Sequence, residues 1–291
     1  MSWRTVVISN TGKLDYKMDY MVVRQADGTT KIHLSEIGMV IIETTAVSMT
    51  ASLLCELTKR KVKVILCDEK RNPNSELISY YGSHDTSAKV RKQIEWTDTA
   101  KKLIWTEIVS EKIRKQASFL KSLGKDEHIL LDGYVEEIQV GDISNREGHA
   151  AKVYFNALFG LSFTRTAEVS INAALNYGYG IILSAFNREI VANGYITQLG
   201  IFHDNMFNQF NLGSDLMEPF RPLIDREVYE MNPQKFEREE KLQLVDVINK
   251  EVIIDTKHNF VGNAIKIYCK SVFDALKDND ISLIRFYRDE L

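Results

Sequence analysis

The chain has 291 residues, of which 44% are hydrophobic and 26% are charged, as in a folded protein of one large or two modest domains. Its formal net charge of −3 argues against a uniformly basic nucleic-acid-binding protein but permits a basic face. The absence of a long apolar run or a signal-peptide pattern excludes a membrane protein and a secreted one, and the scattered Cys55, Cys67 and Cys269 indicate reduced thiols, so a cytoplasmic location is expected.

The first part of the chain alternates apolar and polar residues, which is typical of short β-strands. The strands expected from this pattern are Trp3–Ser9, Tyr20–Gln25, Thr30–Leu34 and Met39–Glu43. Asp27-Gly28 predicts a hairpin turn, because this pair readily adopts the positive φ angles of tight turns. A helix over Ser48–Lys59 and a buried strand over Val62–Cys67 complete a β-rich domain, which we predict to span residues 1–74.

Helical periodicity dominates the remaining residues, 75–291, after a short linker near residues 75–87. The helices expected from it are Ala88–Leu123, Arg146–Leu158, Ala167–Phe186, Arg188–Thr197, Asp215–Tyr229, Glu239–Ile248 and Asn259–Leu276. Ser144 and Asn145 are candidate caps for the helix that starts at Arg146. The sequence therefore predicts an α+β protein, with an N-terminal β-rich domain followed by a larger, all-helical domain.

Motifs for several common chemistries are missing from the sequence. It contains no phosphate-binding Walker loop, no GxGxxG, no GxSxG and no paired-cysteine zinc spacing. His203 is followed by Asp215 and Glu218, which share one face if they lie on a helix. Two like charges on one face are costly unless a cation lies beside them, which is a hint of metal binding. Asp215 could equally cap the free N–H groups of that helix.

Four ordered motifs in the second half of the chain resemble one known family. They are Asn145–Tyr154 (NREGHAAKVY), Ala174–Tyr179 (ALNYGY), Gln198–His203 (QLGIFH) and Asp215–Pro222 (DLMEPFRP). Together they resemble the CRISPR-associated endonuclease family Cas1, and the expected N-terminal strands and helix fit its β-domain. The resemblance thus covers nearly the whole chain, and the stretch Asn211–Glu218 looks most like the type II branch, which accompanies single-protein effector nucleases.

The resemblance implies a metal site and its ligands. By motif, the family's catalytic and metal-binding residues fall on Glu147, His203 and Glu218. Other branches often have aspartate where this chain has Glu218, so its carboxylate reaches one methylene further. Asp215 is expected to support the site by orienting one of the ligands. Two carboxylates and an imidazole suit Mg²⁺ or Mn²⁺.

The resemblance also implies the reaction and the partners. A member of this family would be a metal-dependent DNA endonuclease or integrase that joins the 3′ ends of double-stranded prespacer DNA to a CRISPR repeat. It would act as a homodimer in a heterocomplex with the small Cas2 protein, without a membrane partner. Two alternatives stay open at this point, a metal-dependent nuclease acting on branched DNA in repair and a non-catalytic DNA-capture scaffold.

One segment is a candidate path for the DNA backbone. Between Ser87 and Lys115, Lys and Arg outnumber Asp and Glu, whereas acidic residues dominate Ser214–Thr256. Phosphate groups bind basic surfaces through a salt-dependent release of counterions. We therefore predict a basic track along the first segment that contains Lys89, Arg91, Lys92, Lys112 and Lys115.

Overall fold

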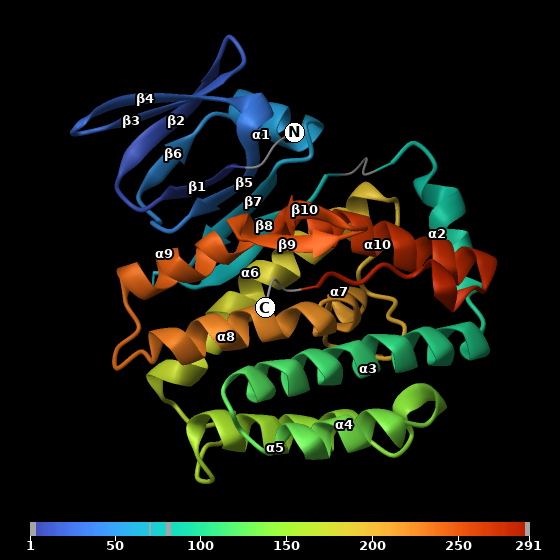
Figure 1. The fold of residues 1–291 in the computed structure, drawn as a ribbon. Coiled ribbons are helices and arrows are strands. Elements are labelled where there is room, and N and C mark those ends of the chain that lie inside the picture. Colours follow the sequence, from blue (N-terminus) through green and yellow to red (C-terminus); the bar gives the residue numbers. More distant parts are fainter. Residues whose placement is uncertain (1–3, 70, 80–82, 289–291) are drawn as a thin grey trace.

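The structure of the chain is a computed structural model that describes residues 4–69, 71–79 and 83–288. A strand-rich part is built from the first residues, and a larger helical part lies against it (Figure 1). Within the described residues, no helix has both the length and the apolar character needed to cross a membrane. The two-part α+β architecture predicted from the sequence is confirmed.

Two four-stranded sheets make up the N-terminal part. The first sheet has the order β1 (Arg4–Ile8), β5 (Ile37–Ile42), β7 (Lys63–Cys67) and β8 (Pro73–Leu77). The second has the order β4 (Gly28–His33), β3 (Tyr20–Gln25), β2 (Gly12–Lys17) and β6 (Val47–Met49). The 3₁₀ turn η1 (Leu34–Glu36) and helix α1 (Ala51–Lys59) connect them. In the first sheet β1, β5 and β7 are parallel, and β8 runs antiparallel to β7.

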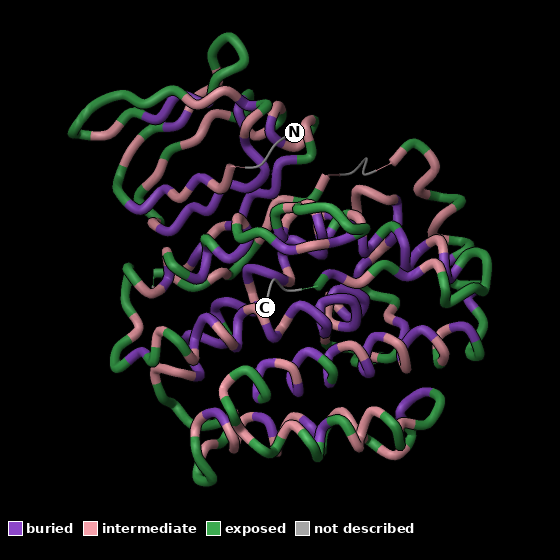
Figure 2. The backbone as a smooth tube through the Cα atoms, in the orientation of Figure 1, coloured by how far each residue is buried: buried purple, intermediate pink, exposed green. Residues whose placement is uncertain are grey.

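The first sheet lies between two hydrophobic cores, because successive strand residues point to opposite faces. On β5, Val40 and Ile42 pack into a core shared with Leu14 of the second sheet. Met39 and Ile41, on the opposite face of the same strand, belong to the core of the helical part. All six residues of β5 are accordingly buried (Figure 2). The shared strand anchors the helical part to the sheet.

The helical part surrounds two long helices, α3 (Asp98–Ser122) and α6 (Ser170–Ala192). The other helices are α2 (Thr86–Ile94), α4 (His128–Glu136), α5 (Arg146–Phe159), α7 (Asn211–Leu216), α8 (Arg221–Met231), α9 (Arg238–Asp246) and α10 (Val261–Asp278). The 3₁₀ turns are η2 (Val140–Asp142), η3 (Glu218–Phe220), η4 (Val247–Asn249) and η5 (Ile281–Leu283). Buried aromatic side chains, among them Trp105, Phe186 and Tyr268, fill the space between these helices.

Several details differ from the sequence predictions. The helical part is not all-helical, because β9 (Glu251–Ile254) and β10 (Lys257–Phe260) form an antiparallel hairpin ahead of α10. The predicted domain boundary at residue 74 falls within β8. Residues 170–192 form one continuous helix where two were expected. Trp3 of the first expected strand and residues 80–82 of the expected linker lie outside the described residues.

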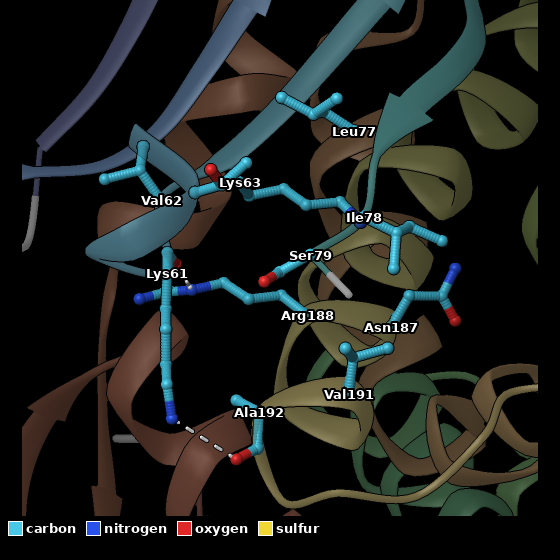
Figure 3. Close-up of a pocket in the computed structure, with 11 residues that line it drawn as sticks. Lys61, Val62, Lys63, Leu77, Ile78, Ser79, Asn187, Arg188, Val191 and Ala192 are labelled. Atoms are coloured by element: carbon cyan, nitrogen blue, oxygen red, sulfur yellow. Dashed lines mark hydrogen bonds between the residues drawn. The ribbon is translucent and has the colours of Figure 1, made fainter. Parts of the chain in front are cut away.

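A small pocket marks the junction between the sheet and α6 (Figure 3). Lys63 on β7 is buried and pairs with Glu76 on β8, which also accepts a hydrogen bond of 3.3 Å from Ser184 on α6. Arg188 on α6 donates a hydrogen bond of 2.7 Å to the carbonyl oxygen of Lys61. These polar bonds add directional contacts to the apolar packing and fix α6 against the sheet.

Candidate active site

The three residues that the sequence assigned to a metal site come from separate elements. Glu147 lies in the first turn of α5, His203 in the loop between α6 and α7, and Glu218 at the start of η3. The structure brings the two carboxylates to one point, which is the ammonium nitrogen of Lys112 on α3. Lys112 Nζ lies 2.5 Å from Glu147 Oε1 and 2.5 Å from Glu218 Oε2.

The start of α5 is held by two side chains. Asp142 accepts hydrogen bonds from the backbone N–H of Arg146 at 2.7 Å and of Glu147 at 3.0 Å. Asn145 has a left-handed φ of 52° and accepts a bond from the N–H of Gly148, as its predicted role as a cap requires. These bonds satisfy N–H groups that a helix start leaves free, and they fix where Glu147 points.

Asp215 organises the loop that carries His203. Its fully buried carboxylate accepts hydrogen bonds from the backbone N–H of Ile201 at 2.6 Å, of Phe202 at 3.0 Å and of His203 at 3.1 Å. His203 Nδ1 lies 2.5 Å from the same carboxylate, whose hydrogen bond raises the pKa of the imidazole. Asp215 therefore does not cap α7 but folds the preceding loop.

This arrangement also sets the state of the imidazole. With the carboxylate of Asp215 at Nδ1, the proton of a neutral ring resides on that nitrogen, and Nε2 keeps its lone pair. The His203 side chain is 38% exposed, so the ring remains reachable from solvent. Trp105 meets the ring edge-on, with 5.8 Å between the centroids, and limits its rotation. His203 thus offers an oriented nitrogen ligand at the surface of the site.

Glu218 is buried between two cations. Pro219 directly follows it, and the chain forms a 3₁₀ turn here instead of the continuous helix expected from the sequence. Burial by itself would raise the pKa of Glu218, but Arg221 and Lys112 outweigh burial and hold the pKa below its ordinary value. Arg221 Nε donates to Glu218 Oε1 at 2.8 Å, and its guanidinium lies 4.5 Å from the ring centre of Tyr179.

Lys112 is the part of the site that sequence reasoning misplaced. It was assigned with Lys115 to an exposed basic track, yet both side chains are buried. Lys115 donates a hydrogen bond of 2.6 Å to the carbonyl oxygen of Tyr287, so neither lysine can line a DNA surface. The signal that could have found them is the helical spacing of four residues from buried Ile104 and Ile108 to Lys112.

Lys89, Arg91 and Lys92 on α2 remain at least partly exposed, so the predicted track shrinks to this helix. Asn172 accepts a hydrogen bond from Arg165 at 2.5 Å and donates to the carbonyl oxygen of Ala167, which makes it a buried polar connector. The pocket at the sheet junction contains none of the three predicted ligands.

The donor set fits a hard divalent cation. Two carboxylates and one imidazole are ligands of the kind that Mg²⁺ and Mn²⁺ accept, with positions left over for water or phosphate oxygens. The Lys112 ammonium shows that both carboxylates already converge on a positive charge. Within the described ranges, no three His, Cys, Asp or Glu side chains are grouped closely enough to hold a metal as they stand. A cation would therefore have to rearrange this cluster.

Comparison with known proteins identifies the family. The profile of the family described as CRISPR associated protein Cas1 matches residues 6–244. A CRISPR-associated endonuclease Cas1 from Neisseria meningitidis is 34% identical over 264 residues, which cover 89% of this chain and 87% of that protein.

Solved structures share the fold across almost the whole chain. A casposase bound to an integration product matches with a TM-score of 0.77 and 16% identity over 96% of this chain and 91% of the casposase. A Cas6-RT-Cas1–Cas2 complex matches with a TM-score of 0.75 and 18% identity over 97% of this chain and 36% of the matched one. The extent of the profile match and the identity to the Neisseria protein show that this chain belongs to the Cas1 family of CRISPR-associated proteins.

Proposed function

We propose that this chain is the metal-dependent integrase subunit of CRISPR adaptation, which joins the 3′ ends of double-stranded prespacer DNA to a CRISPR repeat. The observation that carries the proposal is the convergence of Glu147 and Glu218 on one cationic point, with His203 held nearby by Asp215. These three residues, Glu147, His203 and Glu218, are the proposed ligands of Mg²⁺ or Mn²⁺ and the proposed catalytic residues.

The reaction is an exchange of phosphodiester bonds. The 3′-hydroxyl oxygen of the prespacer forms a bond to a phosphorus of the repeat, and the bond between that phosphorus and the 3′-oxygen of the flanking strand breaks. The attacking hydroxyl loses a proton, and the departing oxygen gains one. When bound, a divalent cation supplies a more acidic hydroxyl and neutralises charge on the phosphate.

The protein residues supply position and charge around that exchange. Glu147 and Glu218 hold the cation position, and Asp215 keeps His203 Nε2 available as a ligand. Arg221 stays against Glu218 through its 2.8 Å bond and keeps this buried carboxylate ionised. Placement of the DNA decides the product, because water in place of the 3′-hydroxyl would give nicking instead of joining.

The proposed assembly is a homodimer that binds double-stranded DNA together with a Cas2 partner in the cytoplasm. The matched Cas6-RT-Cas1–Cas2 complex supports such a partner, because its Cas1 portion shares this fold. The matched casposase, which is bound to an integration product, supports strand joining as the chemistry of the fold.

The test is a strand-joining assay with labelled prespacer, a plasmid carrying the repeat, Mn²⁺ and the Cas2 partner. Glu147→Gln, His203→Ala and Glu218→Gln should each abolish joined product. Glu239→Gln, a matched change of an exposed carboxylate on α9, should leave it unchanged. Shortened strands without joined product would favour a nuclease instead, and normal joining by any of the three variants would remove that residue from the proposed site.

A further inference from the structure

Lys112 has an unusual position for a lysine in a protein of this proposed function. It is fully buried on α3, and its ammonium bonds one oxygen of Glu147 and one oxygen of Glu218. A buried ammonium is costly unless it is paired, and here two carboxylates pair it. Lys112 thus occupies the position at which the two proposed carboxylate ligands meet.

The oxygens of the two carboxylates are nearly all engaged. Glu218 Oε2 bonds Lys112, and its Oε1 accepts a hydrogen bond from Arg221. A divalent cation that binds both carboxylates must therefore displace one of these two basic groups from Glu218. The groups differ in how firmly they are held.

Arg221 is the less movable of the two. Its planar guanidinium lies 4.5 Å from the ring centre of Tyr179, in addition to its bond to Glu218. Lys112 has a flexible side chain, and its ammonium is held by its bonds to the two carboxylates. The cation should consequently replace Lys112 and leave Arg221 in place.

We propose that Lys112 is a positioning residue that acts as an internal counter-ion: it holds Glu147 and Glu218 together before the divalent cation binds and competes with that cation for them. This inference rests on the proposed metal-dependent function. It follows that the metal-free protein keeps its two carboxylates in place without a bound ion. It also follows that the protein binds the cation less tightly than the same ligands would without the lysine.

Charge balance gives the competition a second consequence. In the metal-free cluster, the two carboxylates are balanced by Lys112 and Arg221. A divalent cation leaves the cluster with an excess of positive charge, and a DNA phosphate can offset that excess. Cation and DNA should therefore each strengthen the binding of the other by the same factor.

The test measures Mn²⁺ binding by calorimetry on the full-length protein without DNA. Lys112→Met removes the ammonium but keeps much of the side-chain volume. Mn²⁺ should then bind about tenfold more tightly or better, a change of about 1.4 kcal/mol. The melting temperature without Mn²⁺ should fall, because two carboxylates are left without this partner, and Mn²⁺ should raise it by more than in the wild type.

Lys115→Met is the matched control. It removes an equally buried ammonium from the same helix, but one that bonds the carbonyl oxygen of Tyr287 and pairs with Glu111. Its Mn²⁺ affinity should equal that of the wild type. Unchanged or weaker Mn²⁺ binding by Lys112→Met would overturn the proposal, because a competitor cannot be removed without effect.

A measurement on the wild type keeps the proposal testable if Lys112→Met fails to fold. In a crystal structure with Mn²⁺ bound, Lys112 Nζ should have left at least one of Glu147 and Glu218. A bound Mn²⁺ with both of these bonds intact would overturn the proposal. If the wild type binds no Mn²⁺ even with prespacer DNA present, the metal-dependent function itself fails, which is a different result from normal binding with an unmoved lysine.

Discussion

Replacing Asp215 with Asn tests whether this carboxylate sets the state of the His203 ring. The substitution keeps the shape of the side chain but removes its charge and one of its acceptors. If the amide oxygen keeps the bonds from Ile201 and Phe202, the amide NH₂ faces the His203 N–H and Nδ1. The NH₂ group can then donate only to Nδ1, so the ring proton has to move to Nε2.

The magnitude follows from these four bonds. Two of the carboxylate's hydrogen bonds are broken or reversed, and the other two no longer have the strength that the charge gave them. Since hydrogen bonds to charged groups contribute about 1.5–3 kcal/mol each, unfolding free energy should fall by about 2–4 kcal/mol. A ring protonated at Nε2 cannot bind a cation, and removal of such an orienting partner costs about 10–100-fold in metal affinity.

Two measurements separate the outcomes. Urea denaturation reports the unfolding free energy, and calorimetry reports Mn²⁺ affinity, with Asp204→Asn as a matched control because it changes an exposed carboxylate in the same loop. If Asp215→Asn is destabilised but binds Mn²⁺ like the wild type, the carboxylate holds the loop and does not set the ring. If neither quantity changes, the reasoning from these bonds is refuted.

Three further predictions follow from the structure. In Gly200→Ala the added methyl group would overlap the carbonyl oxygen of His203, so the melting temperature and the yield of joined strands should both fall, and a wild-type melting temperature would contradict this. Burial raises the pKa of Asp225 to about 6 from 3.8, so unfolding free energy should decrease as pH rises between these values. Asp225→Asn should remove that decrease and stabilise the protein above pH 7 by about 1–3 kcal/mol in urea denaturation, whereas an unchanged pH profile would show that this carboxylate is not the cause. Charge reversal of the basic residues on α2 should make the slope of log affinity for duplex DNA against log salt shallower by about 1 for each phosphate that the variant no longer binds, and an unchanged slope would place the DNA elsewhere. These residues are Lys89, Arg91 and Lys92.

The elements that the sequence predicted well are those with a local signal. β3, Tyr20–Gln25, was expected with its observed bounds, and Asp27-Gly28 lies at the turn between β3 and β4 as expected. Strand β2, Gly12–Lys17, was missed because Lys13, Asp15 and Lys17 hide its short apolar alternation. Its strand character depends on pairing with β3, which is a tertiary contact that no local pattern encodes.

The long helices show the same limit from the opposite side. A break was expected between Phe186 and Arg188, since a polar Asn-Arg pair interrupts the apolar run. The structure continues α6 through this point because Asn187 is buried and Arg188 bonds the carbonyl oxygen of Lys61. The polar residues interrupt the pattern but not the helix, because the sheet supplies Arg188 with a partner.

The site divides into what the motifs could predict and what they could not. Glu147, His203 and Glu218 could be selected by resemblance, and Asp215 was expected in a supporting role that its bonds to the His203 loop now describe. Lys112 could not be separated from a surface lysine by its charge, since a basic residue on a long helix is ordinarily solvated. Its partners are 35 and 106 residues away along the chain, so the compensation that permits its burial exists only in the folded protein. A buried charge is thus the kind of site residue that sequence reading misplaces, because the periodicity that buries it and the carboxylates that pair with it belong to different parts of the sequence.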